Sequence, residues 1–183
     1  MHRHKQLLPW GATTVIEEIV ARVSGKLAAT VVVLGHNASA VSSRLSSFDV
    51  QIAINEEYRR GMLSSVKCGL AAAAGASAYL VFLGDQPVVD GDVIDAVVNA
   101  HAASGKGIVI PTFAGKRGHP VLIGAEYADE ILALEDDQGL NRVTRGHAED
   151  TLEVPVETET VLEDMDTPED YRRIAVKHGG ADG

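Results

Sequence analysis

Three aspartates in the sequence carry the chemistry needed to hold a divalent cation. Asp85 follows residues 78–83, an unbroken apolar run that is closed by one glycine. Such a short run with β-branched and aromatic members predicts a strand that is buried on both faces. Asp164 and Asp166 lie two positions apart, so in an extended segment both carboxylates face the same side. Carboxylate oxygens are ligands that Mg²⁺ prefers, often together with phosphates, and either residue could complete a pair with Asp85.

Each aspartate also has a simpler interpretation. Asp85 can cap the turn that follows it or the helix expected near Asp92. Asp164 and Asp166 can act as acids ahead of a helix, because T-P-E-D at 167–170 supplies a threonine cap, a proline and two acids in the first turn. From local sequence alone, the two roles of Asp85 are about equally supported, and spacing favours the helix role for the other two.

Polar residues also occupy other loops that are expected near Asp85. Gly61, Ser64 and Ser65 open a predicted helix and can present free N–H groups to a ligand, although a plain N-terminal cap explains them as well. His36 and His119 each follow a glycine in a loop, where a histidine is more often structural or merely exposed than catalytic. Lys5, Lys116 and Arg117 can neutralise phosphates, although most surface cations have no specific partner.

Strands and helices alternate along the chain, and they must position these residues. Strands are expected over residues 29–34, 50–54, 78–83, 107–111, 120–123 and 151–156, with helices over 15–24, 38–45, 62–74, 91–103, 127–134 and 140–145 and a last one opening at 167. The alternation predicts a single α/β domain, mainly parallel in its sheet, with helices on both faces. In open α/β sheets ligands bind at the carboxyl ends of the strands, where Asp85 is expected. We expect the domain to span residues 1–177 and the Gly-rich tail 178–183 to be disordered.

Composition excludes several classes of protein. The 183 residues carry a net charge of −10, which argues against broad binding to nucleic acid or to a membrane surface. The single cysteine, Cys68, cannot form an internal disulfide, and the sequence has no zinc-binding pattern. No apolar run has the length of a membrane span and the start has no signal-peptide core, so we expect a cytoplasmic protein.

Seven segments occur in an order that resembles one family, the MobA-like nucleotidyltransferases, and most of all its molybdenum cofactor cytidylyltransferases. They are K-Q-L-L-P-W (5–10), V-L-G-H-N-A (33–38), N-E-E-Y-R-R-G-M-L-S-S-V (55–66), L-G-D-Q-P (83–87), R-G-H-P-V-L (117–122), D-D-Q-G (136–139) and D-M-D-T-P-E-D (164–170). The resemblance implies a Rossmann-like fold and a Mg²⁺-dependent transfer of a nucleoside monophosphate. CMP from CTP, or else GMP from GTP, would pass to the phosphate of a molybdopterin-type cofactor, and pyrophosphate would leave.

The resemblance also implies roles for single residues. Asp85 and Asp166 match the metal-binding aspartates, and Asp85 is expected to be catalytic together with Lys5. Lys5 matches the lysine that contacts the nucleotide phosphates, while His119 and Gln138 match positions that face the acceptor. The residues that match the nucleotide-binding loop are Asn55, Gly61, Met62, Ser64 and Ser65.

The opening of the family pattern has no match in this sequence. The family begins with a strand and the loop Leu-Ala-Ala-Gly-x-Ser-x-Arg-Met-Gly-x-x-Lys. Here Met1 falls where the methionine of that loop stands, and His2 replaces the glycine that follows it. We therefore expect the first, central strand to be missing from the sheet, and we expect the natural start to lie upstream. The alternatives are transfer to another small phosphorylated acceptor, or a non-catalytic chaperone that delivers the cofactor to a molybdenum hydroxylase.

Overall fold

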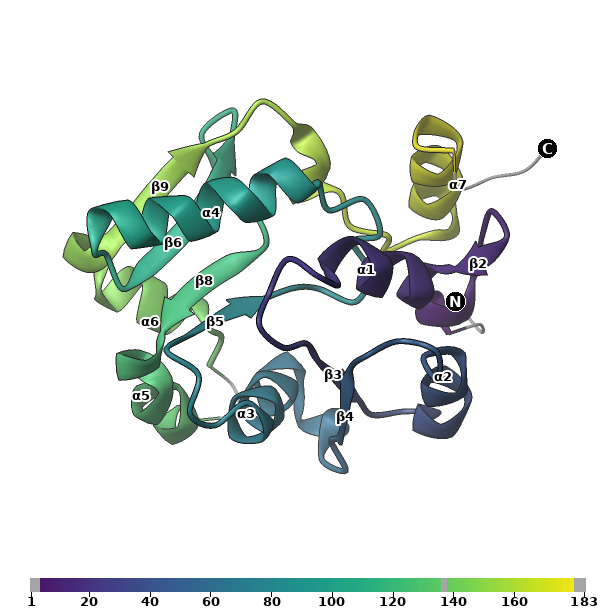
Figure 1. Cartoon of the computed structure of the whole chain (residues 1–183), viewed down its shortest axis with the longest axis horizontal. Helices are drawn as coiled ribbons and strands as arrows, with labels where there is room; N and C mark the ends of the chain where they lie inside the picture. Colours follow the sequence, from purple (N-terminus) through teal and green to yellow (C-terminus); the bar gives the residue numbers. More distant parts are fainter. Residues whose placement is uncertain (1–3, 136–137, 180–183) are drawn as a thin grey trace.

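Two separate sheets carry the strands whose ends were expected to form the site (Figure 1). The computed structural model describes residues 4–135 and 138–179. In the smaller sheet, β3 (Val31–Leu34) pairs in parallel with β4 (Gln51–Ile54). The larger sheet has the order β5–β8–β6–β7, with β9 on the other edge of β6; these strands are β5 (Ala78–Val81), β6 (Ile108–Phe113), β7 (Lys116–Arg117), β8 (Val121–Gly124) and β9 (Thr151–Pro155).

The larger sheet is mixed in direction. β8 runs antiparallel to both β5 and β6, so those two strands share one direction, and β9 runs parallel to β6. β8 reverses because the chain returns from β6 through the short strand β7 with no helix between them. The other connections between the longer strands pass through helices, so the α/β class expected from the alternation is confirmed.

Helices flank the sheets, and α1 and α7 begin at the threonine caps expected for them. They are α1 (Val15–Val23), α2 (Ala38–Arg44), α3 (Met62–Ala72), α4 (Gly91–Ser104), α5 (Ala128–Ala133), α6 (Asn141–Gly146) and α7 (Pro168–Lys177). At the start of α1, the backbone N–H of Thr14 donates to Glu17 at 2.9 Å. At the start of α7, Thr167 and Asp170 exchange the equivalent contacts. None of the described helices is long and apolar enough to span a membrane.

The N-terminal segment packs against the last helix. A 3₁₀ helix (Lys5–Leu7) leads into a small hairpin of β1 (Pro9–Trp10) and β2 (Thr13–Thr14). Trp10 is buried in one cluster with Met165 and Ile174, and Met165 has no exposed surface. The two ends of the described chain therefore lie together, which Figure 1 shows around the label N and helix α7.

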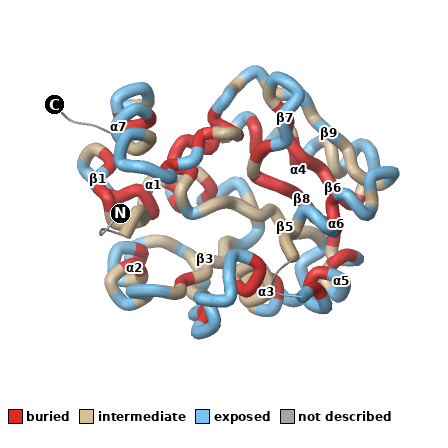
Figure 2. Tube along the Cα trace, turned by 180° about the vertical axis from the view of Figure 1, so that it is seen from behind, coloured by how far each residue is buried: buried red, intermediate tan, exposed pale blue. Residues whose placement is uncertain are grey.

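Strand β5 is less buried than the sequence predicts. All four of its residues are only partly buried, whereas every residue of β8 is buried (Figure 2). Within the described chain β5 pairs only with β8 and β3 pairs only with β4, so each is an edge strand. An edge strand lacks cover on one side, and this explains why residues 78–83 are not buried on both faces.

The first residue of the expected tail, His178, contacts the body of the protein. Helix α7 ends at Lys177, but the imidazole of His178 still lies 2.9 Å from the carboxylate of Glu163. Residues 180–183, which make up most of the expected tail, lie outside the described residues, as do Met1 and His2.

Candidate active site

Lys5 lies between the two carboxylates that were expected to hold the metal. Its Nζ is 2.9 Å from Oδ1 of Asp166 and 3.4 Å from Oδ2 of Asp85. The three residues come from the N-terminal 3₁₀ helix, the loop after β5 and the segment before α7, so only the fold brings them together. Burial alone would lower the pKa of Lys5, but hydrogen bonds and charge from Asp166 and Asp85 outweigh burial and raise it. The side chain is therefore a stable ammonium ion at neutral pH.

The segment that carries Asp166 is anchored from two sides. The backbone N–H of Met165 donates to the carbonyl oxygen of Asp85 at 3.1 Å, and the Met165 side chain fills the core beside α7. Asp164 and Asp166, on either side of Met165, are exposed. The alternation of this extended segment thus places both carboxylates outside the core, as the spacing predicted.

The donor set of Asp85 and Asp166 fits a hard divalent cation. Both carboxylates already contact one positive charge, the Lys5 ammonium, so both face a single cation position. Oxygen ligands suit Mg²⁺ and Mn²⁺. In the parts of the chain that the structure describes, no group of three or more His, Cys, Asp and Glu side chains is placed to hold a metal. Water or phosphate oxygens would complete the coordination, as is usual for Mg²⁺.

Asp164 has a different partner from Asp166. The amide of Gln86, which is 1% exposed, donates from Nε2 to Oδ1 of Asp164 at 2.6 Å. Its Oε1 is buried and has no hydrogen-bond partner among the described residues. Gln86 was not among the site residues expected from the sequence, although its place directly after Asp85 was the available signal. Asp85 is therefore paired with Asp166 through Lys5, while Asp164 is held by Gln86.

His119 lies in the same site as Asp85. Its backbone N–H donates to the carbonyl oxygen of Val161 at 3.0 Å, close to the segment of Asp164. A side chain at Gly118 would clash with that carbonyl oxygen, so a glycine is needed for this close packing. Burial lowers the pKa of His119, and the charges of Asp164 and Asp85 oppose that shift only partly. His119 is thus a neutral imidazole at neutral pH, facing two carboxylates.

The predicted nucleotide loop forms one hydrogen-bonded unit at the carboxyl end of β4. Nδ2 of Asn55, a buried residue, donates to Oγ of Ser64 at 2.8 Å and to Oγ of Ser65 at 3.1 Å. Its Oδ1 accepts from the backbone N–H of Glu57 at 2.9 Å. Gly61, just before α3, has φ +110°, which only glycine adopts without strain. These contacts explain why Asn55 and the serines are placed together.

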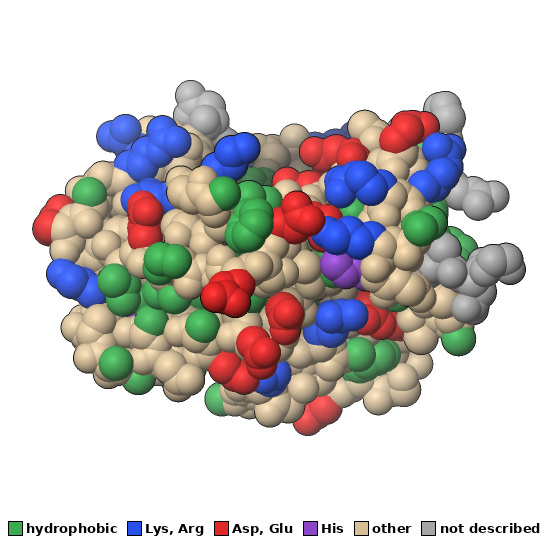
Figure 3. Space-filling model, turned by 90° about the horizontal axis from the view of Figure 1, so that it is seen from above, with side chains coloured by type: hydrophobic (Ala, Val, Ile, Leu, Met, Phe, Trp, Pro, Cys, Tyr) green, Lys and Arg blue, Asp and Glu red, His purple; other side chains and the backbone are tan. Residues whose placement is uncertain are grey.

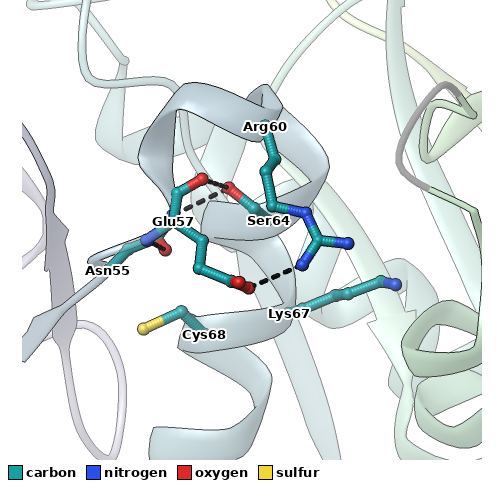
Figure 4. A pocket seen from close by; sticks show the side chains of 6 residues that line it. All are labelled: Asn55, Glu57, Arg60, Ser64, Lys67 and Cys68. Atoms are coloured by element: carbon teal, nitrogen blue, oxygen red, sulfur yellow. Dashed lines mark hydrogen bonds and ion pairs between the residues drawn. The ribbon is translucent and has the colours of Figure 1, made fainter.

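A pocket of about 390 Å³ opens beside this loop (Figure 4). Glu57 and Arg60 point toward one another in it and form an ion pair of 2.9 Å. Lys67 donates to the carbonyl oxygen of Leu134 at 2.5 Å. The full lining is Asn55, Glu57, Arg60, Ser64, Lys67 and Cys68. Four of these were not expected from the sequence as site residues: Glu57, Arg60, Lys67 and Cys68. Glu57 and Arg60 lie within the segment 55–66, and Lys67 follows it directly.

No described contact joins Gln138 or Met62 to Asp85. Oε1 of Gln138 accepts from the backbone N–H of Glu135 at 3.2 Å, and no described contact joins Gln138 to His119. The first two residues of the D-D-Q-G segment, 136 and 137, lie outside the described residues. Met62 is 64% exposed at the start of α3. The roles suggested for Gln138 and Met62 stay predictions.

A buried carboxylate anchors α7, which follows the site segment directly. The Glu163 side chain is 5% exposed and pairs with Lys177 at 2.9 Å, Arg173 at 3.3 Å and His178 at 2.9 Å. Burial would raise the pKa of Glu163, but the hydrogen bonds from Lys177 and His178 prevail and lower it. Figure 3 views the molecule from above and shows basic side chains next to acidic ones at the right, the side on which α7 lies in Figure 1.

Comparison with known proteins places the chain in a family. Residues 1–152 match the model of the MobA-like NTP transferase domain. Nicotine blue oxidoreductase of Paenarthrobacter nicotinovorans is 29% identical over 178 residues, covering 93% of this chain and 87% of that protein. Rv0371c of Mycobacterium tuberculosis, solved in complex with manganese, is 28% identical with a TM-score of 0.80, covering 96% of this chain and 93% of that one. A nucleotidyl transferase from Methanothermobacter is 27% identical with a TM-score of 0.81, covering 96% and 85%. The chain thus belongs to the MobA-like NTP transferase domain family and is a nucleotidyltransferase.

Proposed function

We propose that this nucleotidyltransferase moves CMP from CTP to the phosphate of a molybdopterin-type cofactor and releases pyrophosphate, with Mg²⁺ or Mn²⁺ as its metal. The observation that carries the proposal is the cluster of Lys5, Asp85 and Asp166, which combines a cation for phosphates with carboxylates for a metal. The manganese in the complex of Rv0371c supports a divalent metal. The segments L-G-D-Q-P and R-G-H-P, which resemble the cytidylyl branch, support the choice of CTP and of the acceptor.

The reaction requires positioning and charge neutralisation more than covalent chemistry. An oxygen of the acceptor phosphate attacks the α-phosphorus of CTP, and the bond from that phosphorus to the bridging oxygen of the β-phosphate breaks. A metal held by Asp85 and Asp166, when bound, supplies positive charge to the triphosphate. The Lys5 ammonium contacts the phosphates and offsets the charge that develops on pyrophosphate. The attacking phosphate is already ionised, so the protein needs no general base.

The other site residues are assigned to binding. Asn55 with Ser64 and Ser65 presents polar groups at the end of β4, where the base and sugar would lie. The exposed Met62 offers apolar surface to a base. His119, a neutral imidazole, is suited to donate a hydrogen bond to the acceptor without adding charge. Transfer of the product to a molybdenum hydroxylase stays a prediction.

Pyrophosphate release tests the proposal. The purified protein is incubated with CTP or GTP, Mg²⁺ or Mn²⁺, and molybdopterin, with the Asp85→Asn variant as matched control. We expect release with CTP, a slower rate with GTP and a rate at least about a hundredfold lower in the variant. Preference for GTP would reassign the base, and release only with a different small phosphate would reassign the acceptor. Cofactor binding with no release under any condition would favour the chaperone.

A redox reaction is a second candidate, because the relative that is 29% identical is named an oxidoreductase. Such a reaction transfers electrons and yields no pyrophosphate. The same incubations, followed by absorbance of the acceptor and of an added reduced nicotinamide nucleotide, separate the two. A change in absorbance that does not depend on the Asp85 carboxylate would favour the redox candidate.

A further inference from the structure

The cation position between Asp85 and Asp166 is already filled by a side chain of the protein itself. The Lys5 ammonium contacts both carboxylates, and these are the only partners that its Nζ has among the described residues. The Lys5 and Asp85 side chains are each about one quarter exposed, at 25% and 26%, so water screens their contact only in part. A metal ion that binds both carboxylates therefore competes with Lys5.

Binding of a metal ion without nucleotide is unfavourable while Lys5 occupies the position between the carboxylates. It would bring a second positive charge next to the ammonium, and like charges at close range repel strongly in a partly buried site. The described residues also offer no third side chain of the kind that ligates metals. A triphosphate resolves both difficulties, because its oxygens complete the coordination of the metal and supply new anionic partners for Lys5.

We propose that Lys5 couples metal binding to nucleotide binding: its ammonium leaves Asp85 and Asp166 for the phosphates as the metal and the triphosphate bind together. This inference rests on the proposed function, since it assumes that these carboxylates hold the metal. The coupling is reciprocal, so a nucleotide triphosphate raises the affinity for the metal by the same factor as the metal raises the affinity for the nucleotide.

Mn²⁺ binding in solution tests the coupling without any activity assay. Free Mn²⁺ is measured by electron paramagnetic resonance during titration of the full chain, first alone and then with CTP. In Lys5→Met, which keeps an unbranched side chain one atom shorter but removes its charge, we expect Mn²⁺ alone to bind about tenfold more tightly than in the wild type. We also expect CTP to raise the Mn²⁺ affinity by a smaller factor in Lys5→Met.

Two control variants isolate the charge of Lys5. Lys5→Arg keeps a cation between the carboxylates and should leave the Mn²⁺ affinity without nucleotide as weak as in the wild type. Lys26→Met removes an ammonium that pairs with Asp95 at 2.6 Å, away from the proposed metal site, and should change neither measurement. Thermal unfolding of each variant confirms that it is folded before titration.

The outcomes separate failure of the coupling from failure of the site. Unchanged or weaker Mn²⁺ binding in Lys5→Met, together with loss of binding in Asp85→Asn, would overturn the coupling and leave the proposed metal site in place. Mn²⁺ binding that is indifferent to Asp85→Asn in the presence of CTP would remove the metal from this site. That result would overturn the coupling and the metal role in the proposed function together.

Discussion

The buried amide of Gln86 donates a hydrogen bond of 2.6 Å to Oδ1 of Asp164, and this contact joins the loop after β5 to the segment before α7. Asp85 is the neighbour of Gln86, and Asp166 lies two residues beyond Asp164. The bond therefore fixes the distance between the two segments that carry the proposed metal ligands. It acts together with the contact from the Met165 N–H to the Asp85 carbonyl oxygen.

Replacing Gln86 with glutamate should destabilise the protein in a pH-dependent way. A buried carboxylate beside Asp164 has no donor to offer, so its charged form is disfavoured and its pKa in the folded protein rises above that of the unfolded chain. The penalty is therefore small at acid pH and grows as pH rises through the folded pKa. At about pH 7 we expect Gln86→Glu to lower the free energy of unfolding by about 3 kcal/mol. Urea denaturation at several pH values measures this.

The variant Gln86→Met separates charge from the loss of the bond. It removes the donor to Asp164 but also the buried Oε1 that has no partner, so these two effects partly offset each other. We expect a change in the free energy of unfolding below about 1 kcal/mol that does not depend on pH. A penalty in Gln86→Glu that is the same at acid and neutral pH would contradict the proposed pairing.

Asp85→Asn should separate function from stability. The ion pair of Asp85 with Lys5 is 3.4 Å long and partly exposed, so its loss costs less than about 1 kcal/mol. In the proposed function the Asp85 carboxylate helps to hold a metal ion, and such a charge is worth several kcal/mol in the transition state. On that proposal we expect pyrophosphate release to fall about a hundredfold or more. Melting curves and the release assay are run on the same preparation. A large loss of stability with activity retained would mean that Asp85 is a structural residue.

The sequence predicted the positions of helices and strands better than it predicted how deeply each strand is buried. The apolar positions of α1, with Val15 and Ile19 buried, follow helical spacing, and this periodicity can be read locally. The burial of β5 could not be read in that way. Residues 78–83 have the composition of a central strand, but burial depends on which strands pair beside them, and strand neighbours are set by the whole sheet.

The sequence predicted site residues best when the residue type itself allows few kinds of chemistry. Aspartates at strand and helix ends suggested a metal, but spacing left open whether Asp164 or Asp166 meets Asp85. The fold decides this, since Lys5 approaches Asp166 and Gln86 approaches Asp164. Contacts between residues far apart in the chain, such as Lys5 with Asp166, leave no local pattern. Resemblance to a family was therefore the only feature of the sequence that distinguished Lys5 from other surface cations.

Ser64 and Ser65 should differ in what their removal costs, although both accept from Asn55. Ser64 is 8% exposed, so Ser64→Ala leaves a buried N–H of Asn55 without a partner and should cost about 1–2 kcal/mol of stability. Ser65 is less buried, and water can replace its hydroxyl, so Ser65→Ala should cost below about 1 kcal/mol. Urea denaturation compares the two variants. Equal costs would show that the burial of Ser64 does not make its hydrogen bond with Asn55 worth more than that of Ser65.

Glu163→Gln should weaken the anchor of α7, and the effect should vanish in acid. The pKa of Glu163 is lowered in the folded protein from its ordinary value of 4.5, so its stabilising contribution is present above that value and is lost as pH falls through the lower folded pKa. At about pH 7 the variant loses charge-assisted hydrogen bonds with Lys177 and His178, worth about 1–2 kcal/mol because these partners are partly exposed. At lower pH the wild type protonates and the two proteins converge. The control is Glu169→Gln, which removes a carboxylate in an exposed pair with Arg172 and should have little effect at any pH. A difference for Glu163→Gln that persists in acid would mean that packing, not charge, holds this residue.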